Sequence, residues 1–129
     1  MERHVLSVCT SCASAHRMKQ TVRRSGGERL LEQLQTIDRT APVEGLAIAP
    51  HECLGACDRA CAIAFNAPGK YIYLFGDLPV DDAQLESTAT AVMQFASQYQ
   101  AKPDGTISYL KCPELLKKRV VARIPPLAT

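Results

Sequence analysis

Apolar and polar positions alternate in blocks that predict a strand, a helix and a second strand in the N-terminal half of the chain. Residues 4–8 form a short apolar stretch of strand length that ends on Cys9. Over residues 28–39 apolar side chains recur at helical spacing, which predicts an amphipathic helix. These side chains are Leu30, Leu31, Leu34 and Ile37. Residues 43–49 predict the second strand, which Pro50 ends.

The second half of the chain predicts a hairpin followed by a helix. Residues 61–66 and 70–75 are two further strand candidates, and an Ala-Pro-Gly turn at 67–69 joins them. A second helix is predicted to open at Pro79 or Val80, and one of its faces carries the side chains that we expect to be buried. These are Leu85, Thr88, Ala89, Val92, Met93 and Ala96.

A tail over residues 102–129 follows this helix. It opens with Lys-Pro-Asp-Gly, which breaks a helix, and it contains a basic and apolar segment at 117–124 to which no regular element is assigned. Residues 117–126 suit two packing partners equally well, the chain's own sheet and the second subunit of a homodimer.

The predicted order of elements is β-α-β followed by β-β-α. This order indicates an α/β domain of thioredoxin-like type with a C-terminal tail. A chain of 129 residues forms one domain, residues 1–129, and can bury a core without disulfides. A metal is therefore not needed merely to fold it.

Composition narrows the classes of function. Hydrophobic residues at 47% and charged residues at 22% are typical of a soluble globule, and the formal net charge is +2. Aromatic residues make up only 5%, with no Trp, so we expect no nucleic-acid partner. The apolar run at residues 5–8 is too short for a signal peptide or a membrane span, so we expect a cytoplasmic protein without a membrane partner.

The six cysteines are clustered rather than scattered. They are Cys9 and Cys12 in one pair, Cys53, Cys57 and Cys61 in a second group, and Cys112 alone. In a reducing compartment, clustered cysteines are more often metal ligands or catalytic thiols than disulfides. If the first two strands are neighbours, their ends bring the two groups together as the two halves of one soft-metal site.

The spacing of the second group favours an iron–sulfur cluster over zinc. Zinc ribbons usually pair cysteines with two residues between them, whereas Cys53 and Cys57 enclose three, Leu-Gly-Ala. Gly55 and Ala56 leave backbone N–H groups free to approach thiolate sulfurs, which would tune a redox potential.

This arrangement resembles the thioredoxin-like [2Fe-2S] ferredoxins, including the small cluster-bearing subunit of respiratory complex I. Those proteins place two ligands on an early loop and two on a Cys-x3-Cys loop, which implies a cluster bound by Cys9, Cys12, Cys53 and Cys57. Their first two ligands are about a dozen residues apart, whereas only two residues separate Cys9 from Cys12. They also often carry Pro at the position of Cys61.

The chain resembles still more closely a bacterial family of predicted metal-binding proteins, Domain of Unknown Function family 1636. The motifs that carry this resemblance are Val-Cys-Thr-Ser-Cys at 8–12, Glu-Cys-Leu-Gly-Ala-Cys-Asp-Arg-Ala-Cys at 52–61, Ala-Pro-Gly-Lys at 67–70, Phe-Gly-Asp-Leu at 75–78 and Val-Ala-Arg-Ile-Pro-Pro-Leu at 121–127. The family has no settled activity, and its genes often lie beside genes for cobalamin synthesis or metal chaperones.

Two alternative chemistries use the same cysteines. Cys9 and Cys12 are spaced as a thiol–disulfide oxidoreductase pair at a strand end, although residues 13–24 do not start a helix whose dipole would lower a thiol pKa. Residues 13–27, which end in two glycines, are instead predicted to be a polar loop. Cys61 is either a buried thiol or an extra ligand in a zinc or cobalt metallochaperone site.

The remaining candidates carry weaker patterns. Cys112 is predicted to be a lone thiol, and His51 a polar loop histidine rather than a ligand of a Rieske-type cluster. A group of basic residues is available to dock an acidic protein partner for redox or metal transfer. These are Arg17, Lys19, Arg23, Arg24 and Arg59.

The sequence therefore predicts a small [2Fe-2S] protein that transfers electrons or carries clusters. No phosphate-binding loop, nucleophile elbow or recognisable carboxylate pair is present, so we expect that the protein is not itself an enzyme.

Overall fold

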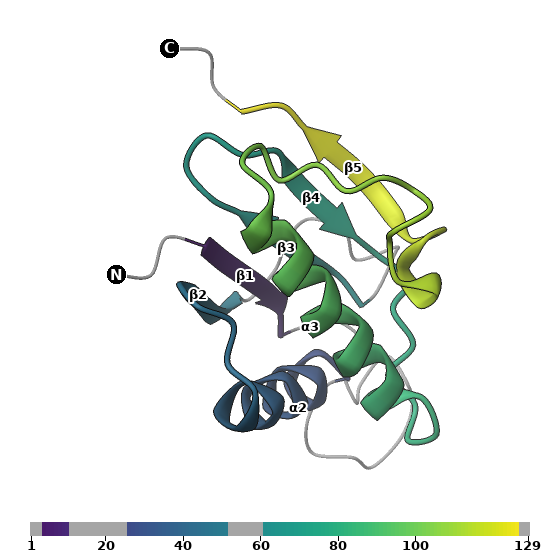
Figure 1. Cartoon of the computed structure of the whole chain (residues 1–129). Helices are drawn as coiled ribbons and strands as arrows, with labels where there is room; N and C mark the ends of the chain where they lie inside the picture. The colour runs from purple at the N-terminus through teal and green to yellow at the C-terminus, as the bar shows by residue number, and fades with distance from the viewer. Residues whose placement is uncertain (1–3, 11–25, 52–60, 127–129) are drawn as a thin grey trace.

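The computed structural model describes residues 4–10, 26–51 and 61–126, which form a five-stranded mixed sheet with two α-helices (Figure 1). In chain order the elements are β1 (His4–Cys9), α2 (Gly26–Thr40), β2 (Leu46–His51), β3 (Ile63–Asn66), β4 (Ile72–Phe75), α3 (Leu85–Ala101), the 3-10 helix η2 (Glu114–Leu116) and β5 (Val120–Ile124). The predicted α/β class and the predicted order of β-α-β then β-β-α are confirmed.

The strands lie in the order β2-β1-β3-β4-β5. β1 runs parallel to β2 and antiparallel to β3, while the β3/β4 and β4/β5 pairs are antiparallel. Because β1 and β2 are parallel and β3 runs the other way, the end of β1, the end of β2 and the start of β3 share one edge of the sheet. The end of β1 carries Cys9, as predicted.

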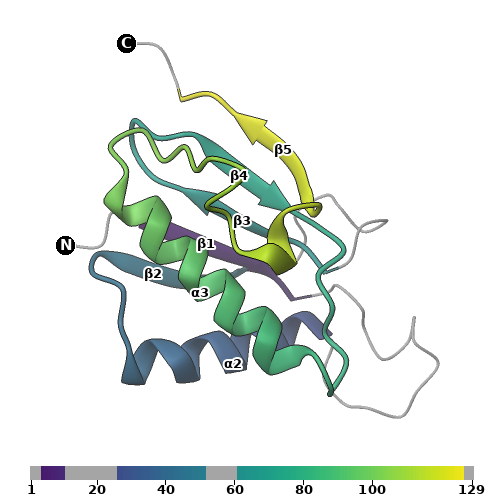
Figure 2. The same cartoon turned by 45° about the vertical axis from the view of Figure 1, so that its right-hand side comes forward.

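Both helices cover the same face of the sheet, with α2 packed beside α3 (Figure 2). On β1 the side chains of Leu6 and Val8 are fully buried, whereas the alternating Val5 and Ser7 are partly exposed, as expected for a strand with one covered face. Arg29 of α2 forms an ion pair with Asp82, which lies just before α3.

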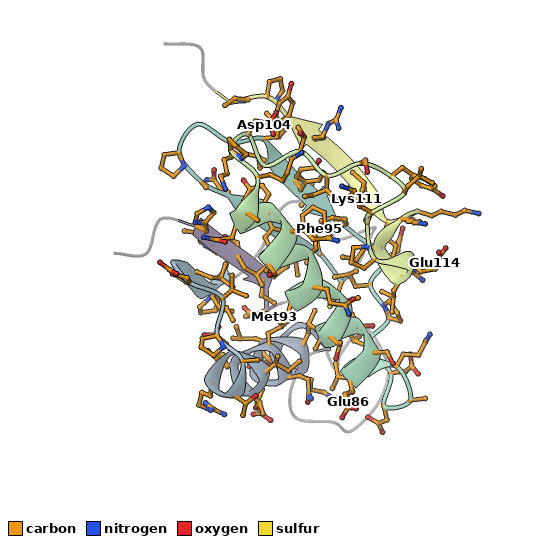
Figure 3. All side chains as sticks on the ribbon, in the orientation of Figure 1. Glu86, Met93, Phe95, Asp104, Lys111 and Glu114 are labelled. Carbon is orange, nitrogen blue, oxygen red and sulfur yellow. The ribbon has the colours of Figure 1, made fainter. Side chains whose placement is uncertain are left out.

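An aromatic cluster fills the space between α3 and the centre of the sheet. Phe95 of α3 points toward the strands (Figure 3) and its ring centroid lies 5.0 Å from those of Phe65, Tyr73 and Phe75. Tyr99, one turn further along α3, lies 5.6 Å from Phe65. Aromatic pairs at these distances stabilise a core beyond the effect of their buried area.

The C-terminal end of α3 is held by a buried cation. The Lys70 ammonium donates to the carbonyl oxygens of Tyr99 and Gln100, at 2.8 and 3.0 Å, and its Nζ lies 2.8 Å from His4 Nε2. A positive charge at this end of a helix offsets the partial negative charge of the last carbonyls. Burial lowers the pKa of Lys70, and the charge of Asp104 opposes this shift.

The predicted bounds of the second strand are wrong at both ends. Residues 43–45 form a turn instead, in which Gly45 has a φ of 74° and the Leu46 N–H donates to the Val43 carbonyl. At the other end Pro50 lies within β2 rather than after it. β2 is an edge strand, and an edge strand tolerates the loss of one N–H donor.

The predicted start of the second helix is also wrong, because α3 begins at Leu85 and not at Pro79 or Val80. Val80 is buried in the core, and the Pro79 carbonyl accepts a hydrogen bond from Thr88 Oγ1 at 2.7 Å. A turn at Asp81 then leads into the helix, with the Leu85 N–H donating to the Asp81 carbonyl.

The other predicted elements are confirmed with shifted ends. β3 and β4 start two residues later than predicted, at Ile63 and Ile72, and α2 starts two residues earlier, at Gly26. The two glycines that were expected to close a loop thus belong to a helix. Most of the predicted loop, residues 13–25, lies outside the described residues.

The tail contains a strand that the sequence pattern did not predict. β5 pairs with β4, with Ile72 opposite Ile124 and Phe75 opposite Val120. Of the two packing partners considered for this segment, the chain's own sheet is the one seen. No helix in the described part of the chain is long and apolar enough to cross a membrane.

Candidate metal centre

Cys9 is buried at the end of β1, with 1% of its surface exposed. Its N–H donates to the Ala62 carbonyl at 3.1 Å, and in the parallel register it lies opposite His51 of β2. The next residue, Thr10, donates from both its N–H and its hydroxyl to the His51 carbonyl, at 2.7 and 3.1 Å. The chain that leaves Cys9 is therefore fixed to the end of β2.

Cys61 is the second cysteine at this edge of the sheet. It is 1% exposed and immediately precedes Ala62, which contacts Cys9. Its carbonyl accepts a hydrogen bond from the Leu78 N–H at 3.2 Å. Cys61 was predicted to begin the third strand, but it lies two residues before β3, at the point where the chain returns to the sheet.

The N-terminal end of α2 lies directly against Cys9. A Cβ atom built on Gly27 would lie far inside van der Waals contact with the Cys9 carbonyl oxygen, 3.0 Å from the Cys9 carbonyl carbon and 3.2 Å from Thr10 Cα. Gly27 is thus required by a close backbone approach. The positive end of the helix macrodipole faces the start of the cysteine region, where it favours negative charge.

Three of the four predicted ligands, Cys12, Cys53 and Cys57, lie outside the described residues, as do the predicted basic docking residues at 17–24 and 59. Cys9 is the one predicted ligand that the structure describes. Within the described ranges, no group of three or more His, Cys, Asp or Glu side chains is arranged to hold a metal ion.

Cys112 lies in a different part of the fold. It precedes η2, is 9% exposed, and donates its N–H to the Ser108 carbonyl at 3.1 Å. Burial raises the pKa of the Cys112 thiol, and the nearby Lys117 lowers it by a smaller amount. A thiol with a raised pKa stays protonated and is a poor nucleophile at neutral pH, in line with the predicted lone thiol.

His51 is the exposed last residue of β2 rather than part of a loop. The carbonyl oxygen of His51, not its ring, accepts the two hydrogen bonds from Thr10.

The residues at this edge suit a group with soft, anionic ligands. Thiolate sulfur is the preferred donor for iron–sulfur clusters, zinc and cuprous ions. Cys9 and Cys61 supply two buried sulfurs, and the N-terminal end of α2 supplies a partial positive charge that stabilises thiolates. The donor set thus fits a thiolate-bound metal or cluster.

Gly27 is the functional residue that reasoning from sequence missed. The available signal was the pair of glycines directly before the amphipathic repeat, because a glycine that opens a helix often marks a close approach by another part of the backbone.

Comparisons with known proteins give one sequence match and one structural likeness. The model of a family described as protein of unknown function (DUF1636) matches residues 6–126, a span that contains all six cysteines. No curated protein is significantly similar to the chain. A thioredoxin-like [2Fe-2S] ferredoxin from Aquifex aeolicus superposes with a TM-score of 0.49 and 14% identity, covering 83% of this chain and 100% of that one.

Proposed function

The chain belongs to the DUF1636 family of proteins of unknown function, and on this premise we propose that it is a small iron–sulfur protein that transfers electrons or carries clusters. In this proposal the protein is not itself an enzyme and works with a protein partner for redox or metal transfer. The proposed ligands of one [2Fe-2S] cluster are Cys9, Cys12, Cys53 and Cys57.

The observation that carries the proposal is the hydrogen-bonded junction between the ends of β1 and β2. Thr10 and His51 are joined by two hydrogen bonds, and Cys12 and Cys53 each follow one of these residues by two positions in the sequence. Two residues of chain span at most about 7 Å. The segment that leads to Cys12 and the segment that leads to Cys53 therefore start from neighbouring residues.

The residues around Cys9 are suited to hold such a group. Burial of Cys9 excludes water from its sulfur, and the backbone contact with Gly27 fixes the helix whose N-terminal end stabilises negative charge. When bound, a [2Fe-2S] cluster would supply a one-electron couple.

Zinc or cobalt binding, as in a metallochaperone, is the second candidate. The observation that favours it is the position of Cys61, which is buried one residue before the Cys9 contact at Ala62. A site that uses both Cys9 and Cys61 would need only two further thiolates.

A thiol–disulfide oxidoreductase that uses Cys9 and Cys12 is the third candidate. The objection that no helix follows the pair is weakened, because the N-terminal end of α2 reaches Cys9 from further along the chain. A helix N-terminus beside a cysteine lowers its pKa and activates the thiolate.

Anaerobic purification after iron-replete expression separates these candidates. We expect a reddish-brown protein with visible charge-transfer bands and equal amounts of iron and acid-labile sulfide. A colourless protein with one zinc per chain would contradict the iron–sulfur proposal and favour the zinc-binding candidate. Disulfide reductase activity that survives removal of all metal would favour the third.

Serine variants then test the ligand set. We expect Cys9→Ser to lose the visible bands and most of the iron. Cys112→Ser serves as the matched control and keeps both, because Cys112 precedes η2, which leads into β5, and β5 is separated from β1 by β3 and β4. Far-UV circular dichroism of each variant checks that it is folded. Loss of colour in Cys61→Ser with full colour in Cys12→Ser would contradict the proposed ligands.

A further inference from the structure

β5 is an edge strand whose outer side has no partner in the described part of the chain. Such an edge presents unpaired N–H and C=O groups to which another strand can bind. The opposite edge, β2, contains Pro50, which removes one of the donors that a new strand would need. β5 carries no proline within Val120–Ile124, so its backbone is the more complete template.

The exposed large hydrophobic side chains of the described residues all belong to the segment 102–126. Val120 and Ile124, at the two ends of β5, are 40% and 48% exposed, and Tyr109 and Leu110 are 58% and 86% exposed. Tyr109 is tied to the chain before β5, because Lys117 Nζ lies 5.1 Å from the centre of its ring. Large apolar side chains gathered on one surface mark an interaction site.

The same segment carries the positive charge of the chain. Residues 102–126 contain six Lys and Arg against two Asp and Glu, whereas the remaining residues contain nine against eleven. Of the two acids, Glu114 pairs with Lys117 at 3.3 Å, and Asp104 accepts hydrogen bonds from Thr106. Lys111 and Glu114 lie on the same side of the molecule as β5 (Figure 3).

Arg119 serves the fold, whereas other cations of this segment remain exposed. Arg119 donates to the carbonyls of Asp77 and Leu115, at 2.9 and 2.5 Å, and so faces inward. Lys118 and Arg123 are exposed, directly before and within β5. β5 therefore has exposed apolar side chains at its two ends and exposed positive charges at Arg123 within it and Lys118 just before it.

From these features we propose that β5 is the docking site for an extended, acidic segment of another protein, which adds to the sheet as a sixth strand. Backbone hydrogen bonds supply the affinity in such strand addition, and side chains of alternate positions supply the specificity. A second copy of this chain would bring like charges together, which disfavours self-pairing. The acidic residues of the partner would lie near Lys118 and Arg123.

This docking site goes beyond the proposed function and does not depend on it. β5 is three strand spacings from β1, about 14 Å at ~4.8 Å per spacing. The start of β5 lies at the same end of the sheet as Cys9, but β3 and β4 separate the two strands. A partner bound along β5 therefore does not cover Cys9, and binding is expected with or without a metal.

The test uses a fluorescently labelled seven-residue peptide of alternating glutamate and valine as the probe. We expect it to bind the full chain, and we expect amide signals of β5 to shift and gain protection from hydrogen exchange in nuclear magnetic resonance spectra. The same peptide with N-methylated alternate residues cannot form the backbone ladder and is expected not to bind. Signals that shift elsewhere in the chain but not in β5 would overturn the proposal.

Matched charge reversals test the electrostatic part. Lys118→Glu is expected to weaken peptide binding about fivefold to tenfold, and Arg39→Glu, an equal charge change at the exposed end of α2, less than twofold. Equal weakening by the two variants, or a lysine–valine peptide that binds as tightly, would contradict the proposal. So would sedimentation that shows a dimer broken by Lys118→Glu, or single-stranded DNA that binds to β5 more tightly than the peptide.

Discussion

Gly27 determines how closely a helix end can approach the candidate metal centre. Only hydrogen stands between its Cα and the Cys9 carbonyl, so no larger residue fits without a shift of backbone. A side chain at this position would act on the cysteine through its main chain.

We therefore expect Gly27→Ala to destabilise the protein by about 2 kcal/mol, although alanine is the better helix former. The cause is the clash of the new methyl group with the Cys9 carbonyl. Urea denaturation measures the stability, and the iron content of the purified variant, which is expected to fall, reports on the site.

Gly69→Ala is the control for this substitution. Its φ of +74° makes alanine strained, at about 1 kcal/mol, but among the described atoms nothing lies within 4 Å of the added Cβ. It should lose some stability and keep its full metal content. If Gly27→Ala stabilises the chain, as helix propensity alone predicts, then Gly27 does not lie as close to the Cys9 carbonyl as the structure has it.

Among the described residues, Tyr99 has the clearest effect of pH on stability. Its hydroxyl donates to the Tyr71 carbonyl at 2.5 Å, and burial raises the pKa of the phenol from 10.0 to about 12. Between these two values the unfolded chain releases the phenol proton and the folded chain keeps it. Stability is thus fully present below pH 10 and falls as the pH rises from 10 toward 12.

Tyr99→Phe isolates this effect. The variant should lose about 1 kcal/mol at neutral pH, from the missing hydrogen bond, and should show a smaller loss of stability above pH 10 than the parent. Urea denaturation between pH 8 and 11 checks both points, and Lys70 titrates in both proteins, so its contribution cancels in the comparison. Parallel curves above pH 10 would refute the assignment to Tyr99.

At the scale of elements, periodicity predicted which segments are helices and strands better than it predicted where they end. The apolar repeat from Leu30 to Ile37 marked α2, and the stripe from Leu85 to Ala96 marked α3. The ends of these elements depend on contacts across the fold. Val80 is buried in the core before α3 begins, and Pro50 is tolerated within β2 because β2 is an edge strand. Such contacts are absent from local sequence.

β5 was missed for a related physical reason. Apolar and polar side chains alternate only weakly over its five residues. An edge strand has a single neighbouring strand, so its burial depends on that neighbour more than on its own sequence. In the candidate site, the sequence predicted Cys9 at a strand end, and this is confirmed. It gave no means of predicting that a helix beginning seventeen residues later would meet the same cysteine, because α2 reaches Cys9 only through the folded β-α-β unit.

The attachment of β5 to the sheet depends on Arg119. Its guanidinium donates to the Asp77 carbonyl after β4 and to the Leu115 carbonyl in η2, so one side chain joins three elements. Arg119→Ala should therefore cost about 2 kcal/mol in the free energy of unfolding, as expected for hydrogen bonds from a charged donor. Hydrogen exchange should show the loss concentrated in β5.

Lys118→Ala is the neighbouring control. Lys118 is exposed, so its replacement should change the stability by less than about 0.5 kcal/mol. Equal effects of the two alanine variants would show that Arg119 does not hold the strand.

On the scale of the whole molecule, the core of the described residues contains Cys9 and Cys61, but most of its side chains are aliphatic or aromatic and cannot bind a metal. Its largest fully buried side chains include Phe65, Phe75, Phe95 and Tyr99, which lie between α3 and the sheet. A chain with such a core folds without help from a metal, unlike small domains that a metal ion organises.

Removal of the proposed metal should consequently leave a folded protein. After chelation we expect the far-UV circular dichroism of both helices to persist with one cooperative unfolding transition. Its midpoint should fall by about 10 °C, which corresponds to about 3 kcal/mol of lost binding free energy. An unfolded metal-free chain would mean that the cysteine region, not the aromatic core, organises the fold.

The contact between Gly27 and Cys9 also gives a rule for reading the sequences of relatives. A family member with any side chain at the position of Gly27 cannot keep both the first turn of α2 and the end of β1 where they lie here. In such a chain either the helix starts later or the first cysteine is displaced. The residue at this one position thus distinguishes relatives that preserve this cysteine environment from those that have remodelled it.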